Sequence, residues 1–166
     1  MRSLQFAVVV LLTSACAKSA PSTTPIKDPV PMAEGPKEPA ATPATAMLAA
    51  YERVRALLAA DELEGVGAAA REIEATANAA SYTAIATNAA KLAGAADLEA
   101  ARVSFADVSR DVVTLLASDK ALAKGQHVFE CPMVQGYRKW VQPSQDLENP
   151  YMGKKMLACG GESTWE

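Results

Sequence analysis

Sulfur-bearing side chains gather near the C-terminal end of this chain of 166 residues. Two of its three cysteines and half of its six methionines follow residue 120: Cys131, Met133, Met152, Met156 and Cys159. Thiolates and thioethers are soft ligands that suit Cu(I), and Ag(I) by the same logic. Zinc sites more often use Cys and His in CxxC-type spacing, which the sequence lacks. The residue types therefore predict a site for Cu(I) or a similar soft metal ion.

The three sulfurs nearest the C-terminus have the spacing of one helix face. Asn149-Pro150 predicts a helix start, with Asn as the N-cap and Pro at the first helical position, and Gly160-Gly161 predicts its end. Met152, Met156 and Cys159 stand at i, i+4 and i+7, on one face of such a helix. We expect Met156 and Cys159 to be ligands, with Met152 as an additional candidate.

A hairpin is expected to position the other two sulfurs. Residues 127–131 and 139–141 indicate two strands joined by a turn. Cys131 and Met133 stand at i and i+2, on one face if the first strand continues. If this face meets the helix face, up to five sulfurs converge. His127 precedes Cys131 by about 13 Å along an extended strand, so we place it outside the site unless the chain curls.

Residues 1–15 resemble a secretory signal of the lipoprotein type. Arg2 supplies the positive charge at its start, and the apolar core over 6–12 is too short to span a bilayer. Small residues followed by Cys16 resemble the lipobox of bacterial lipoproteins, in which cleavage precedes a Cys that becomes lipidated. Ala17 stands where an Asp commonly retains such proteins at the inner membrane. We therefore expect a lipid anchor on Cys16 in the outer membrane, facing the periplasm.

The next segment, residues 16–43, is predicted to be a disordered tether. It holds seven of the ten prolines and few large apolar residues, so it cannot build a core. Its simplest role is that of a spacer between the lipid and a folded domain over residues 44–166.

Four segments with helical apolar spacing are expected to form the scaffold that carries the sulfurs. Asp61 with Glu64 indicates a capping box for the second helix, and Ser81 and Asp97 are expected to cap the third and fourth. Gly94 is expected to end the third helix. Short connections make neighbouring helices antiparallel. The predicted fold is mainly α, an up-and-down bundle of about four helices followed by a small hairpin and short-helix segment over 120–166.

The same cysteines support a second interpretation. In an oxidising compartment, and with Cys16 lipidated, Cys131 and Cys159 remain as one pair. A disulfide between them would close a loop of about 29 residues and stabilise the fold by roughly 3–4 kcal/mol. The methionines would then be core filler. Spacing alone favours neither interpretation, and the two states could alternate, with copper bound only by the reduced thiols.

Motifs around these cysteines resemble a bacterial domain of unknown function. They are Cys131-Pro132-Met133, Trp140 and the run Asn149-Pro150-Tyr151-Met152-Gly153-Lys154-Lys155-Met156-Leu157-Ala158-Cys159-Gly160. That domain occurs alone in secreted and lipid-anchored proteins, and fused to CusB-like periplasmic adaptors of heavy-metal efflux systems. The resemblance covers about 44–162. It implies that Cys131, Met133, Met156 and Cys159 form a metal or redox site, with efflux components as partners. Met152 stands where the family more often has an aromatic residue.

Composition narrows the class of function. The net charge of −3, without a basic stripe, argues against nucleic acid as a partner. There is no CxxC redox pair, CxxCH haem attachment or Ser/His/Asp signature, so we do not expect an enzyme. Two hypotheses remain. One is a lipid-anchored Cu(I) buffer or carrier linked to heavy-metal efflux. The other is a non-metal tethered interaction module stapled by a Cys131–Cys159 disulfide.

Overall fold

A computed structural model describes residues 41–166 of the chain. They belong to a compact unit over Pro39–Glu166. The predicted signal peptide over 1–15, the lipidation site Cys16 and nearly all of the predicted tether lie outside the described residues. Within the described part, no helix combines the length and the apolar character needed to cross a membrane.

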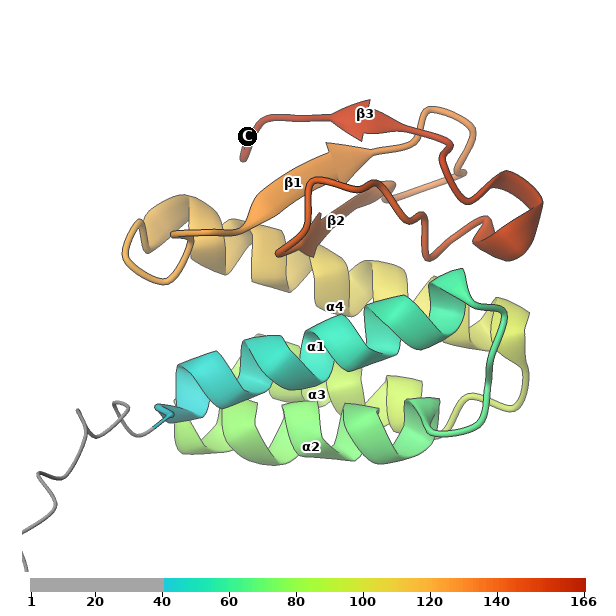
Figure 1. Cartoon of the computed structure of the whole chain (residues 1–166). Helices are drawn as coiled ribbons and strands as arrows, with labels where there is room; N and C mark the ends of the chain where they lie inside the picture. Colours follow the sequence, from blue (N-terminus) through green and yellow to red (C-terminus); the bar gives the residue numbers. More distant parts are fainter. Residues whose placement is uncertain (1–40) are drawn as a thin grey trace, which may run out of the picture. The chain divides into compact units, whose positions relative to one another are not determined.

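Four α-helices form the scaffold: α1 (Pro43–Ala59), α2 (Val66–Ala79), α3 (Thr83–Ala93) and α4 (Leu98–Ser118). Successive helices run in alternating directions. In Figure 1, α2 and α3 form the lower layer, and α1 and α4 lie between that layer and the C-terminal segment. The predicted up-and-down bundle is therefore confirmed.

A small antiparallel sheet covers the α1 and α4 side of the bundle (Figure 1). Its strands are β1 (His127–Glu130), β2 (Lys139–Gln142) and β3 (Gly161–Glu162), in the order β2-β1-β3. The predicted hairpin is confirmed, with Phe129 of β1 opposite Trp140 of β2. The third strand follows a single 3-10 turn, η1 (Gly153–Met156), and brings Gly161 opposite Glu130.

Two predicted helix boundaries, the start of α4 at Asp97 and the end of α3 at Gly94, are confirmed. The side chain of Asp97 caps α4, because its Oδ1 accepts a hydrogen bond from the N–H of Ala100 at 2.8 Å. Gly94 follows the last residue of α3. The bundle begins slightly earlier than expected, since Thr42 caps a helix that starts at Pro43.

Two predicted caps are wrong. Ser81 has a left-handed backbone with φ 64°, which belongs to the turn after α2, so Tyr82 takes the N-cap position of α3. The capping box of Asp61 and Glu64 does not form, because α2 begins only after Gly65 at φ 88°. The carboxylate of Asp61 instead reaches the C-terminal segment, as described below.

A chain of aromatic rings joins the bundle to the sheet. The ring of Tyr51 in α1 stacks on Phe105 of α4 with a centroid distance of 5.1 Å. Phe105 lies 5.7 Å from Tyr151, which meets Trp140 of β2 edge-on at 6.0 Å. Trp140 in turn stacks on Phe129 at 5.8 Å. These rings supply bulk where the small alanine side chains of the helices cannot.

A buried hydroxyl network closes the outer edge of β2. The Tyr51 hydroxyl lies 2.6 Å from Ser109 Oγ and accepts a hydrogen bond from the N–H of Val141 at 3.2 Å. Ser109 and Tyr151 both donate to the carbonyl of Lys139, at 3.0 and 2.8 Å. Burial raises the pKa of Tyr51 and of Tyr151, so both hydroxyls stay protonated. The polar edge of β2 is thus satisfied by Tyr51 and Ser109 of the helices and by Tyr151 of the C-terminal loop.

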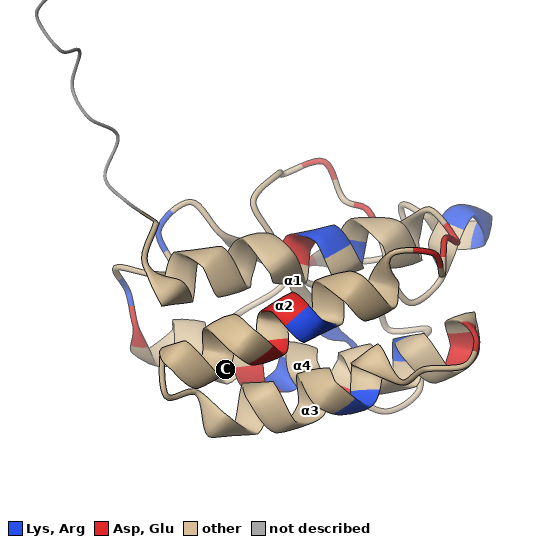
Figure 2. Cartoon of the chain, turned by 90° about the horizontal axis from the view of Figure 1, so that it is seen from below, with Lys and Arg blue, Asp and Glu red and all other residues tan. Residues whose placement is uncertain are grey.

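The helices display charges of both signs. Figure 2 shows short bands of Lys or Arg next to bands of Asp or Glu on α1 and α2, whereas α3 carries a single basic residue, Lys91. Several of these charges pair within the fold, such as Arg53 with Glu72 and Arg110 with Asp107.

Candidate functional site

The structure brings Cys131 and Cys159 together at one end of the sheet. Their Sγ atoms lie 2.6 Å apart, although 28 positions separate them in the chain. Cys131 is fully buried and Cys159 is partly exposed. A disulfide bond is about 2.05 Å long, so the two sulfurs stand within reach of one.

Cys131 is placed by the turn that follows β1. Its N–H donates to the carbonyl of Arg138 at 3.2 Å and so extends the hairpin by one bond. Its carbonyl accepts from the N–H of Val134 at 3.2 Å, which closes a four-residue turn. Pro132 occupies the second position of that turn, for which its fixed φ is suited. The Cys-Pro part of the motif therefore fixes where the first sulfur leaves the sheet.

Cys159 is placed by Asn149, a side chain with no exposed surface. The Asn149 side-chain amide donates to the carbonyl of Cys159 at 2.7 Å, and its backbone N–H donates to Leu157 at 2.8 Å. Its Oδ1 accepts from the N–H groups of Tyr151 and Met152, at 2.8 and 3.1 Å. A helix cap was expected at this position. Asn149 does cap the turn that follows, and it also closes the loop that presents Cys159.

Two glycines of the same motif permit close approaches. Gly153 has φ 58°, and a side chain there would overlap the carboxylate of Asp61. That carboxylate accepts from the N–H of Lys154 at 3.0 Å. Gly160 has φ 137°, and a Cβ there would lie 2.8 Å from the carbonyl oxygen of Glu130. Glycine is therefore required at the first residue of η1, Gly153, and again at Gly160, four residues after η1 ends.

Two arginines of the bundle hold this loop in place. Arg55, a buried residue of α1, donates to the carbonyl of Glu148 at 2.8 Å. Arg102 of α4 donates to the carbonyl of Pro150 at 2.9 Å and to Asp61 at 2.5 Å. The hydrogen bond from Arg102 holds the pKa of Asp61 below its ordinary value, so Asp61 is a carboxylate at neutral pH. Arg55 and Arg102, which are more than 40 positions apart in the chain, therefore both hold the loop that presents Cys159.

The expected helix over Asn149–Gly160 is wrong. Only Gly153–Met156 forms a 3-10 turn, because Asn149 draws Leu157 and Cys159 back toward itself. Met152, Met156 and Cys159 therefore do not share the face of an α-helix. The N–H of Cys159 donates to the carbonyl of Met156 at 2.9 Å, so these two remain one turn apart.

Met133 and Met152 line a separate surface groove of about 560 Å³, which neither cysteine lines. Its other walls come from α4 and from the turn after Cys131, and include Val103 and Tyr137. Val103 is 66% exposed and Met133 is 60% exposed, two of the three exposed large hydrophobic side chains among residues 41–166. Arg110 lies over the ring of Tyr137, 5.0 Å from its centroid.

His127 is not brought to the cysteine pair. It begins β1, whereas Cys131 follows the last residue of that strand, and its Nδ1 lies 3.9 Å from Glu162. No three side chains of His, Cys, Asp or Glu among residues 41–166 are grouped so that they could hold a metal ion. Of the predicted metal ligands, only the thiols of Cys131 and Cys159 lie next to each other in the structure.

The electrostatic setting keeps the Cys159 thiol protonated. The hydrogen bond with Cys131 raises the pKa of Cys159 above its ordinary value, and desolvation adds to this effect. A protonated thiol is a weak nucleophile and a weak metal ligand.

A comparison of the chain with known protein families, with curated proteins and with solved structures finds no match.

Proposed function

We propose that the chain is a lipid-anchored, periplasm-facing interaction module whose C-terminal segment is stapled by a Cys131–Cys159 disulfide. The observation that carries this proposal is the Sγ–Sγ distance of 2.6 Å in a rigidly built setting. The geometry around the pair also supports it, because Asn149 fixes the Cys159 loop and the turn after β1 fixes Cys131.

The binding face of this module is the α4 groove, which lies between α4 and the turn after Cys131. Isolated exposed apolar residues are common on proteins, but here Val103 and Met133 lie in one concavity with Tyr137. The staple begins at the first residue of the turn that carries Met133, so it would hold one wall of the groove in shape. The proposed occupant is an apolar segment of another envelope protein.

Trapping the thiols tests the staple. The protein is isolated from the cell envelope and unfolded in denaturant in the presence of N-ethylmaleimide, with or without prior reduction, and its mass is measured, so that burial does not shield either thiol. We expect no label on Cys131 or Cys159 without reductant and two labels after reduction. The Cys131→Ser variant is the control, because its single remaining Cys159 should be labelled in both samples. Two labels on the unreduced wild-type protein would contradict the proposal.

Photo-crosslinking tests the groove. A photoreactive amino acid is placed at Met133 or, as a control, at Asn78, an exposed residue of α2. We expect a discrete adduct of higher mass in cells from position 133 and none from position 78. Equal adducts from both positions would exclude the groove as the binding face.

A second candidate function is a Cu(I) buffer or carrier linked to heavy-metal efflux, active when the pair is reduced. One observation favours it: two soft sulfur atoms are already adjacent, and Met156 lies one turn before Cys159. Anaerobic Cu(I) titration of the reduced chain against a competing chelator tests it. We expect affinity to fall in Met156→Leu but not in Met133→Leu, which alters the separate groove. If replacing both cysteines by Ser leaves the affinity unchanged, this candidate is wrong.

A further inference from the structure

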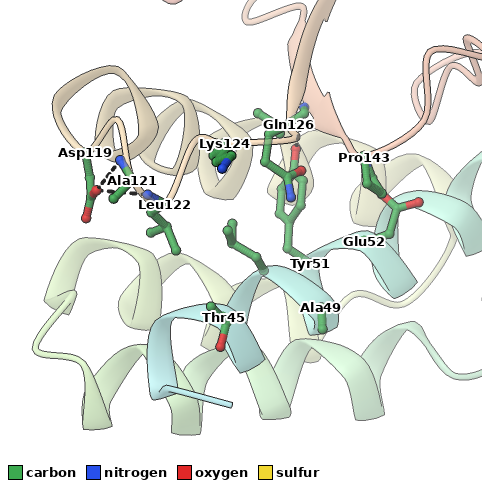
Figure 3. Close-up of a pocket in the computed structure, with 12 residues that line it drawn as sticks. Thr45, Ala49, Tyr51, Glu52, Asp119, Ala121, Leu122, Lys124, Gln126 and Pro143 are labelled. Atoms are coloured by element: carbon green, nitrogen blue, oxygen red, sulfur yellow. Dashed lines mark hydrogen bonds between the residues drawn. The ribbon is translucent and has the colours of Figure 1, made fainter. Parts of the chain in front are cut away.

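A second concave site lies beside the N-terminal half of α1. It has a volume of about 710 Å³ and lies between the N-terminal half of α1, the segment 119–126 and the end of β2 (Figure 3). Pockets of about 300–1,000 Å³ are typical of small-molecule sites. Neither cysteine and no residue of the α4 groove lines this pocket, so it is independent of the function proposed above.

The walls of this pocket are largely apolar. They are formed by the side chains of Leu48, Ala49, Tyr51, Leu122, Val141 and Pro143. Figure 3 shows Leu122 facing α1 across the opening, with Tyr51 deeper in the pocket. Ala49 and Pro143 are exposed and Leu122 is only half-buried, so apolar surface remains in contact with water. Such a surface favours an apolar ligand body.

The two carboxylates of the pocket are engaged by the protein itself. Both oxygens of Glu52 accept hydrogen bonds from Arg55, at 2.7 and 2.8 Å, and an ion pair results. Asp119 Oδ1 accepts from the backbone N–H groups of Ala121 and Leu122, at 3.1 and 2.9 Å. Neither carboxylate is therefore the group most available to a ligand.

Two side chains of the pocket have hydrogen-bond donors without a partner in the described part of the chain. Lys124 and Gln126 line it, and neither side chain has an ion-pair or hydrogen-bond partner among residues 41–166. Lys124 supplies an ammonium group that forms no ion pair within residues 41–166, and Gln126 supplies an amide N–H₂ group. An anionic oxygen is the ligand group that both can bind.

We infer that this pocket binds a fatty acid, with the alkyl chain along the apolar walls and the carboxylate at Lys124. Each additional CH₂ buried against these walls should raise the affinity about fourfold, so affinity should increase with chain length. The carboxylate fixes the orientation of the chain, because the pocket offers a free cation at one place only among the described residues.

Calorimetric titration with laurate tests this inference. The sample is the full chain carrying Cys16→Ser, so that no acyl anchor is present to occupy the pocket or to require detergent. We expect saturable binding of one laurate per chain, and at least tenfold weaker binding of dodecanol and of dodecylammonium, which have the same chain length. Equal affinity for laurate and dodecylammonium, or no saturable binding of laurate, would overturn the inference.

Two pairs of variants locate the site. Lys124→Glu should weaken laurate binding at least tenfold, whereas Lys120→Glu, in the same segment but outside the pocket, should change it less than twofold. Ala49→Trp should fill the pocket and abolish binding, whereas Ala56→Trp, exposed on the same helix but outside the pocket, should not. Equal effects within either pair would overturn the assignment. These results do not depend on Cys131 or Cys159, so they are separable from a failure of the staple.

Discussion

The side-chain amide of Asn149 donates a hydrogen bond to the backbone carbonyl of Cys159 at 2.7 Å, ten positions further along the chain. This bond closes the loop that returns Cys159 to Cys131. The other polar atoms of Asn149 hold the start of the same loop, through the N–H groups of Tyr151 and Met152. The buried side chain of Asn149 therefore holds the loop in the conformation that places Cys159 next to Cys131.

Replacing Asn149 by Ala should lower the free energy of unfolding by about 2–4 kcal/mol, because three side-chain hydrogen bonds are lost and their buried partners are left unsatisfied. Urea unfolding of the reduced protein measures this change without a contribution from a disulfide. Asn78→Ala, at an exposed position of α2, should change stability by less than about 0.5 kcal/mol. A similar loss in both variants would show that Asn149 does not organise the loop.

Gly160 and Gly161 offer a matched pair for the close approach to β1. Gly160→Ala forces a side chain onto a backbone with φ 137° and places its Cβ 2.8 Å from the carbonyl of Glu130, so we expect a loss of at least about 2 kcal/mol. Gly161→Ala meets open space and should cost less than about 1 kcal/mol. Thermal unfolding of the two variants measures the difference. Equal midpoints would mean that the backbone at residue 160 relaxes freely.

Tyr51→Phe tests the hydroxyl network that joins the bundle to the sheet. The substitution leaves Ser109 and the N–H of Val141 without their buried partner, so we expect a loss of about 1–3 kcal/mol. Tyr82→Phe is the control, because the partly exposed hydroxyl of Tyr82 makes no hydrogen bond within residues 41–166. Urea unfolding compares the two. If both variants match the wild type, the network does not contribute to stability.

The parts of the fold that follow from local signals could be predicted from the sequence. The apolar spacing gave four helices, Asp97 and Gly94 marked boundaries, and the hairpin of β1 and β2 followed from its strand residues and turn. The predicted capping box at Asp61 is wrong for a physical reason: aspartate is a favoured N-cap residue, so the local sequence favours a cap there. The actual partners of Asp61, Arg102 and the N–H of Lys154, are remote in sequence.

The candidate site was predicted only in part, and the reason is the same. The sequence predicts the pairing of Cys131 with Cys159 as one of two alternatives, but it also predicts a helical period for Met152, Met156 and Cys159, which the structure does not have. Glycines at residues 153 and 160 were the available signal against a continuous helix, because each permits a left-handed backbone. The α4 groove and the pocket beside α1 are made by residues from separate elements, and no spacing rule joins them.

The reactivity of Cys159 should depend on Cys131. The hydrogen bond between the thiols raises the pKa of Cys159, so in the reduced protein this thiol is protonated and slow to react until the pH exceeds its ordinary value of about 8.5. Cys131→Ala removes the largest cause of the shift, and the midpoint of alkylation should then fall toward that value. The rate of iodoacetamide alkylation at Cys159, followed by mass spectrometry across pH, measures both midpoints. A midpoint in the reduced wild type below the ordinary value, or one that Cys131→Ala leaves in place, would mean that the buried partner does not control Cys159. The second candidate function would then gain support, because Cys159 would be a thiolate, and thus a metal ligand, at a lower pH.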